Sequence, residues 1–126
     1  MLPSMKPAPC ALVVDRSSMV AETVAMALEM MGYRSESATS FREARRLFQT
    51  MPALTLLIAH ADVADERAGG RLLHLARAHR ADLPVIVISS RSRQELPPVP
   101  DDVIFLRKPF DRSELVDAIA KARAAT

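Results

Sequence analysis

Four short and almost uninterrupted apolar runs set the strongest limit on what this 126-residue chain can fold into. They are Ala11–Val14, Leu54–Ala59, Val85–Ile88 and Val103–Leu106. Strands that are apolar at nearly every position are typical of a parallel sheet whose two faces are both covered. Parallel neighbours need long crossover connections, which are usually helices. The pattern therefore predicts an α/β protein.

The segments between these runs carry the signals of helix ends. Ser17 or Ser18 can cap a first helix that ends at Gly32. Ser40 and Glu43 form the pattern of a capping box, in which each side chain accepts a hydrogen bond from the other residue's free backbone N–H group. Two further helices are predicted from apolar stripes at Leu72, Leu73, Leu75 and Ala76, and at Leu115, Ala118, Ile119 and Ala122.

A more polar strand at Tyr33–Ala38 completes a set of five strands alternating with helices. Right-handed crossovers then favour a flavodoxin-like, doubly wound parallel sheet with strand order 2-1-3-4-5 and helices on both faces. The fourth helix is expected to be shortened or irregular. Arg91–Glu95 allows about one helical turn before Pro97, Pro98 and Pro100 interrupt regular structure.

Composition favours a single domain over residues 10–126, preceded by a disordered tail over residues 1–9 that contains three prolines. No apolar stretch approaches the roughly 20 residues of a membrane span. Seventeen Lys and Arg, spread along the chain against fifteen Asp and Glu, leave a net charge of +2, which disfavours nucleic-acid binding. The single cysteine, Cys10, excludes an internal disulfide and fits the reducing cytoplasm.

Three polar residues follow three of the apolar runs: Asp15, Ser89 and Lys108. Ligands of an open parallel sheet bind at the carboxyl ends of its strands, so we expect these side chains to share one pocket. Lys108 can pair with Asp15 there, or it can bind an anion. The sequence leaves both roles open.

The segments Leu12–Asp15 and Leu106–Asp111 (LRKPFD), with Ser89 between them, resemble the receiver domain of two-component response regulators. The resemblance extends over residues 11–122. It implies a domain that a histidine kinase phosphorylates on an aspartate at the end of the third strand. It also implies Mg²⁺ held by that aspartate and by two acids after the first strand.

The resemblance assigns roles to five residues. Asp15 matches the first acid of the pair, Ser89 the hydroxyl that contacts the phosphoryl group, and Lys108 the lysine that contacts it too. Phe105 matches the aromatic residue whose rotamer follows phosphorylation. The peptide bond before Pro109 is expected to be cis.

Arg16 replaces the second acid of the pair. A guanidinium cannot ligate a metal and would repel one. Asp15 alone is a poor site for Mg²⁺, which prefers octahedral oxygen ligation. We therefore expect no cofactor, with Mg²⁺ binding weak or absent. Arg16 either reaches into the pocket and pairs with Asp15 or points to solvent.

The phosphoacceptor is also missing. Counting forward from the first acid gives His60, counting back from the hydroxyl residue gives Ala59, and counting from the proline after the second helix gives Ile58. His60 is either a nucleophile or metal ligand, or a hydrogen-bonded residue at the sheet rim. Asp62, two residues further on, is the alternative phosphoacceptor.

These residues lead to a hypothesis: a receiver-like signalling module that acts through protein contacts, with standard aspartate phosphorylation lost. The alternative is an active receiver phosphorylated at Asp62. No catalytic residues of an independent enzyme are expected, and a histidine kinase or a downstream effector is the expected partner. Monomer and weak dimer both remain open. The shortened fourth helix is expected to expose the surface near Phe105, Leu115 and Ile119.

Overall fold

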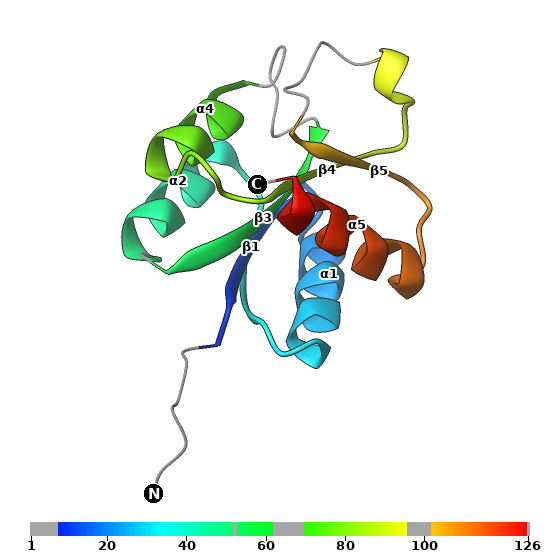
Figure 1. Cartoon of the computed structure of the whole chain (residues 1–126). Coiled ribbons are helices and arrows are strands. Elements are labelled where there is room, and N and C mark those ends of the chain that lie inside the picture. The colour runs from blue at the N-terminus through cyan, green and yellow to red at the C-terminus, as the bar shows by residue number, and fades with distance from the viewer. Residues whose placement is uncertain (1–7, 52, 62–69, 96–101, 126) are drawn as a thin grey trace, which may run out of the picture.

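The computed structural model describes residues 8–51, 53–61, 70–95 and 102–125. Their strands form a parallel sheet in the order β2-β1-β3-β4-β5 (Figure 1). This arrangement confirms the predicted flavodoxin-like fold. The strands are β1 (Cys10–Val14), β2 (Arg34–Ala38), β3 (Leu54–His60), β4 (Val85–Ser89) and β5 (Ile104–Arg107).

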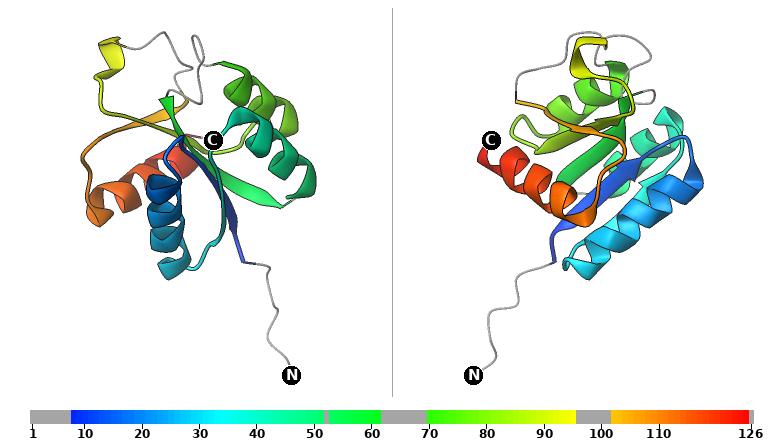
Figure 2. Two further views of the ribbon diagram at one scale, coloured as in Figure 1. Left: turned by 180° about the vertical axis from the view of Figure 1, so that it is seen from behind. Right: turned by 90° about the vertical axis from the view of Figure 1, so that its right-hand side faces the viewer.

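Helices cover both faces of the sheet, with α1 and α5 on one face and α2 and α4 on the other (Figures 1 and 2). A single turn of 3-10 helix, η1, follows β4, as the short Arg91–Glu95 segment predicts. The bounds are α1 (Ser18–Met30), α2 (Phe41–Thr50), α4 (Gly70–His79), η1 (Arg93–Glu95) and α5 (Arg112–Ala124). No helix in these described ranges is long and apolar enough to cross a membrane.

Alternation along β1 divides the core into two layers. Leu12 and Val14 pack with the apolar residues of α2 and α4, whereas Ala11 and Val13 pack with those of α1 and α5. All four side chains are almost completely buried. Successive side chains of a strand point to opposite faces, so a strand buried on both faces must be apolar throughout. This explains the uninterrupted runs in the sequence.

β2 begins one residue later than predicted. The N–H group of Tyr33 donates to the carbonyl oxygen of Leu28, at 3.0 Å, and so belongs to the end of α1. Gly32 between them adopts φ 97°, a conformation that side chains with a Cβ rarely take. Tyr33, which the sequence pattern assigned to the strand, therefore belongs to the turn between α1 and β2.

The predicted capping box at α2 is only half formed. Ser40 Oγ accepts from Glu43 N–H at 3.1 Å, but the Glu43 carboxylate accepts from the N–H and hydroxyl groups of Thr39 instead of Ser40 N–H. At α5 the box is complete. The Asp111 carboxylate accepts from Glu114 N–H, and Glu114 accepts from Asp111 N–H.

The expected exposure is wrong for the α5 residues Leu115 and Ile119. Leu115 and Ile119 are buried, and Phe105 is half-buried against the apolar cluster of α2 and α4. The two α5 residues pack with Ile86, Ile88 and Leu106 of β4 and β5, so the sheet itself covers them. Their burial does not depend on a fourth long helix. Pro97, Pro98 and Pro100 lie outside the described residues.

Candidate functional site

Three strand ends bring Asp15, Ser89 and Lys108 to the carboxyl edge of the sheet. Lys108 Nζ lies 3.4 Å from Asp15 Oδ2, in an ion pair whose side chains are 26% and 8% exposed. The pair spans the ends of β3 and β4, which lie between β1 and β5. A buried carboxylate needs compensation of its charge, and Lys108 supplies it.

The second oxygen of the Asp15 carboxylate is also occupied. Oδ1 accepts from the N–H group of Ser17, the N-cap residue of α1, at 2.9 Å. The Asp15 N–H group donates to the carbonyl oxygen of Ala38 at 3.0 Å, which joins the end of β1 to β2. Both carboxylate oxygens are therefore held by groups of the protein.

Ser89 is the other buried polar residue of this edge. Its hydroxyl oxygen accepts from Arg91 N–H at 3.0 Å, and its carbonyl oxygen accepts from Lys108 N–H at 2.8 Å. The first contact makes the hydroxyl an acceptor in the turn after β4. A hydroxyl group is both donor and acceptor, so Ser89 can also donate its own proton.

Strand register distinguishes the three possible acceptor positions. Val14 pairs with Ala59, so Asp15 and His60 are the next residues along β1 and β3. His60 also pairs with Ile88, the residue before Ser89. Ile58 and Ala59 are completely buried among apolar side chains, whereas His60 is half-buried at the rim. The position level with Asp15 is thus a histidine. Asp62 lies outside the described residues.

Arg16 is exposed, and the described contacts of the Asp15 carboxylate are to Ser17 and Lys108. Among the described residues the donor set does not fit Mg²⁺, because Asp15 supplies the one carboxylate, an ammonium already pairs with it, and hard cations need several oxygen ligands. Within residues 8–51, 53–61, 70–95 and 102–125, no group of three or more His, Cys, Asp or Glu side chains is placed to hold a metal ion.

No family model and no curated protein matches the sequence. Solved structures do match the fold. A response regulator receiver protein from Sinorhizobium medicae has a TM-score of 0.79 and 22% identity, over 94% of this chain and 96% of that chain. The chemotaxis protein CheY4 of Vibrio cholerae has a TM-score of 0.75 and 19% identity, over 92% and 99%. The receiver domain of the hybrid histidine kinase CckA has a TM-score of 0.71 and 25% identity, over 90% and 98%. The chain has the receiver fold.

Two further residues of the receiver resemblance belong to β5 and to the turn that follows it. Phe105 pairs with Val87 in the sheet and is half-buried. The peptide bond between Lys108 and Pro109 is cis. On this receiver fold, the polar residues at the carboxyl edge of the sheet therefore include an acid, a hydroxyl, a lysine and a histidine.

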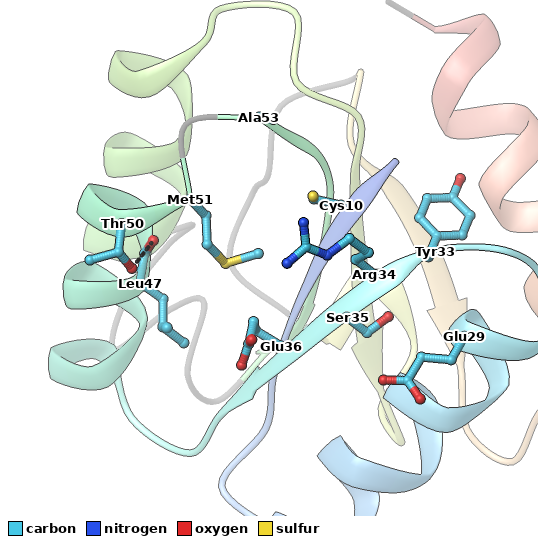
Figure 3. Close-up of a pocket in the computed structure, with 10 residues that line it drawn as sticks. All are labelled: Cys10, Glu29, Tyr33, Arg34, Ser35, Glu36, Leu47, Thr50, Met51 and Ala53. Atoms are coloured by element: carbon cyan, nitrogen blue, oxygen red, sulfur yellow. Dashed lines mark hydrogen bonds between the residues drawn. The ribbon is translucent and has the colours of Figure 1, made fainter. Parts of the chain in front are cut away.

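The opposite, amino edge of the sheet holds a hollow of about 590 Å³ that the sequence did not indicate (Figure 3). It lies between the ends of α1 and α2 and along the start of β2. The only sequence signal for it is the polar strand itself, Arg34–Ala38, which no motif marks as functional.

Tyr33 lines this hollow and is 7% exposed. Burial raises the pKa of its hydroxyl, and the nearby Arg123 guanidinium acts in the opposite direction. Arg123 Nη2 donates to the Tyr33 hydroxyl, and the guanidinium carbon lies 5.3 Å from the centre of the ring. Burial has the larger effect, so the neutral phenol is the favoured form.

Two exposed carboxylates elsewhere have lowered pKa values. A hydrogen bond from Arg80, at 2.7 Å, is the main cause for Asp82. Hydrogen bonds from the Ser92 hydroxyl and N–H groups are the main causes for Glu95 in η1. Neither residue is in contact with the pocket residues in the described interactions.

Proposed function

We propose that this protein is a receiver-like signalling module of a bacterial two-component or phosphorelay system, acting in the cytoplasm through protein contacts and without standard aspartate phosphorylation. The receiver fold of its structural neighbours supports the signalling class. The proposed loss of aspartate phosphorylation rests on the β3 residue level with Asp15, which is His60 instead of an acid.

Charge in the pocket supports the same proposal. Phosphoryl transfer depends on positioning and on neutralising the charge of the transferred group. Here the Lys108 ammonium is committed to the Asp15 carboxylate at 3.4 Å, so the one described carboxylate of the pocket is already compensated. The pair maintains the pocket in one charge state without a metal or a phosphoryl group.

A phosphodonor assay tests the proposal directly. The protein is incubated with labelled acetyl phosphate and Mg²⁺, and the amide NMR spectrum is recorded with and without Mg²⁺ and beryllofluoride. We expect no label and an unchanged spectrum at millimolar Mg²⁺. Stable label, or shifts spreading from Asp15 through Ser89 to Phe105, would show a working acceptor and contradict the proposal.

Asp62 is the acceptor of the competing hypothesis, an active receiver phosphorylated by a histidine kinase. If the wild-type protein takes up label, D62N decides between the two candidate acceptors, Asp62 and His60. Loss of label in D62N would assign phosphorylation to Asp62. Label that persists in D62N and disappears in H60N would assign it to the imidazole.

Restoring the missing acids is the first testable prediction. The double substitution R16D/H60D returns a carboxylate to each of the two positions that depart from the receiver pattern. We expect this variant to gain Mg²⁺ binding and label from acetyl phosphate. The matched control is R16N/H60N, which removes the same cation and imidazole without adding charge and should gain neither. Equal behaviour of the two variants would show that more than these two positions silences the pocket.

The partner in this proposal is a histidine kinase or a downstream effector, and the module itself is not an enzyme. Capture of a kinase by the wild-type protein and by R16D/H60D alike would support binding that does not need phosphoryl transfer. Binding that appears only in the restored variant would contradict a role based on contacts alone.

A further inference from the structure

β2 is an edge strand of the sheet, with β1 as its inner neighbour. An edge strand offers backbone N–H and C=O groups to another strand, and proteins usually protect it with prolines, bulges or charges. β2 has the sequence RSESA, contains no proline, and pairs with β1 without a shift of register. Its protection consists of two charges of opposite sign.

The backbone groups that point outward from β2 belong to its serines. The Arg34 N–H group donates to the residue before β1 at 2.8 Å, and the Ala38 carbonyl accepts from the residue after β1 at 3.0 Å. Backbone groups alternate in direction along a strand. Since the even-numbered residues face β1, the N–H and C=O groups of Ser35 and Ser37 face away from the sheet.

Side chains alternate in the same way. Arg34 and Glu36 are exposed and extend from the face of β2 toward Met51 of the α2 side, and Ser35 extends from the other face (Figure 3). An antiparallel pair of β2 strands centred on Ser35 places Arg34 of each copy opposite Glu36 of the other. Opposite charges directly across a strand pair attract, and like charges repel.

The charge pattern selects this register over its competitors. A shift by two residues keeps the serine backbone groups paired but sets Arg34 opposite Arg34, or Glu36 opposite Glu36. Parallel in-register pairing sets both like pairs together. The pairing centred on Ser35 joins the backbone groups of the two Ser35 residues and is the register that matches both charges. In it Ser37 lies opposite Tyr33, whose N–H group is already bonded to the Leu28 carbonyl oxygen, so the charges decide the register. Attraction in one register with repulsion in the others gives specificity.

We infer that the outer edge of β2 binds a second copy of this chain, as an antiparallel pair of β2 strands centred on Ser35. The N–H and C=O groups of the two Ser35 residues exchange two hydrogen bonds, because they form a hydrogen-bonded pair of the ladder.

The hollow beside β2 has room for the side chains that the second copy brings. Its volume is about 590 Å³, and Leu47 and Met51 of the α2 side line it together with Arg34 and Glu36. Opposite residues of an antiparallel pair share one face of the sheet. Arg34 and Glu36 of the second copy therefore lie over this hollow, and their aliphatic stems contact its apolar wall.

A five-residue edge strand makes a small interface. Interfaces below about 1,200 Å² of total buried surface are typical of weak, transient complexes. We therefore expect a dimer that forms as the concentration rises and dissociates on dilution. Dimerisation through β2 does not depend on Asp15, Ser89 and Lys108, which lie at the carboxyl ends of the other strands.

Sedimentation equilibrium over a range of concentrations tests the inference, as a second prediction. The wild-type mass should rise from 13.8 kDa toward twice that value. R34E alone and E36R alone each create two like-charge contacts, and each should weaken association by about tenfold. R34E/E36R reverses both charges, recreates the opposite pairs and should restore association to within about threefold of the wild type.

The control is R112E, which makes the same change in net charge at an exposed position at the start of α5, far along the fold from β2. It should leave association unchanged. Arg34 and Glu36 are exposed, so the single variants should fold. The double variant contains both substitutions and should still associate, so it shows that neither substitution prevents folding. A wild-type mass that stays monomeric would overturn the inference. So would a dimer that R34E leaves intact, or one that the double reversal fails to restore.

Discussion

The two edges of the sheet treat polar groups in opposite ways. At the carboxyl edge, Asp15 is buried but fully partnered, by Lys108 and by the Ser17 N–H group. At the amino edge, β2 leaves the Ser35 hydroxyl without a partner among the described residues, beside an open hollow. The carboxyl edge is the one that sequence motifs single out. The receiver motifs thus identify the carboxyl edge, where the polar groups are partnered within the protein. The Ser35 hydroxyl, unpartnered among those described residues, lies at the amino edge, which no sequence motif identifies.

Breaking the ion pair between Lys108 and Asp15 should have the largest effect on stability. It tests whether the polar groups of the carboxyl edge depend on one another as partners. K108M leaves the Asp15 carboxylate buried without its counter-charge, so we expect the free energy of unfolding to fall by roughly 2 kcal/mol. This loss is smaller than that for a fully buried ion pair, because Lys108 is partly exposed and solvent screens its charge. Urea unfolding measures it.

D15N/K108M removes both charges and should recover most of the loss from K108M. K121M is the matched control, since it breaks the exposed ion pair between Lys121 and Asp117, at 3.9 Å, and should cost less than about 0.5 kcal/mol. If K108M were as mild as K121M, the pocket pair would be a surface contact, and the contrast between the two edges would be lost.

Arg77 provides a test within the amino edge. Its Nη1 atom donates to the carbonyl oxygens of Ala81 and Leu83, and its Nη2 atom lies 2.8 Å from Asp102 Oδ2. Nη2 meets this carboxylate as an ion pair without hydrogen-bond geometry, so two hydrogen bonds and one ion pair hold this half of the edge. R77M should lower the free energy of unfolding by about 1.5 kcal/mol, because it leaves the Leu83 carbonyl without its charged donor. A negligible change in urea unfolding would show that water replaces the guanidinium there.

The smallest effect concerns Tyr33 and alkaline pH. Burial raises the pKa of Tyr33 above its ordinary value of 10.0, so the unfolded chain loses the proton first as the pH rises. The stability from burying the neutral phenol is present below pH 10 and is lost as the pH rises through the folded-state pKa.

Absorbance of tyrosinate measures this titration cleanly, because the chain contains one tyrosine. The folded protein should titrate at higher pH than the same chain in urea. In Y33F, the fall in the free energy of unfolding that results from deprotonation of the phenol should disappear. Coincident titration of folded and unfolded chains would show that the phenol is solvated, and that the amino edge is more open than the structure indicates.

The fold could be predicted because its determinants are local or periodic. Strands buried on both faces are identified by apolar runs without polar alternation, and the two ends of α1 are marked by Ser17 through capping and by Gly32 through backbone conformation. Errors occurred where a residue has two possible partners. Tyr33 closes α1 instead of starting β2, and Glu43 bonds Thr39 instead of Ser40.

The candidate site could be predicted in part. The convergence of Asp15, Ser89 and Lys108 follows from parallel strands that end at one edge. The residue level with Asp15 could not be fixed, because counting along a sequence does not give register, and three counts gave three answers. The hollow at β2 was missed for a related reason: its walls come from four separate elements, β1, α1, β2 and α2, whose approach is set by packing.

Tyr33 and Arg123 connect the ends of the two helices on one face, α1 and α5, through a hydrogen bond and a ring contact. The chain contains no tryptophan, so the intrinsic fluorescence of the protein comes from this one ring. Detachment of the last turn of α5 would remove the guanidinium from the phenol and change the emission before the sheet opens. The emission of Tyr33 therefore reports whether the end of α5 remains packed against α1.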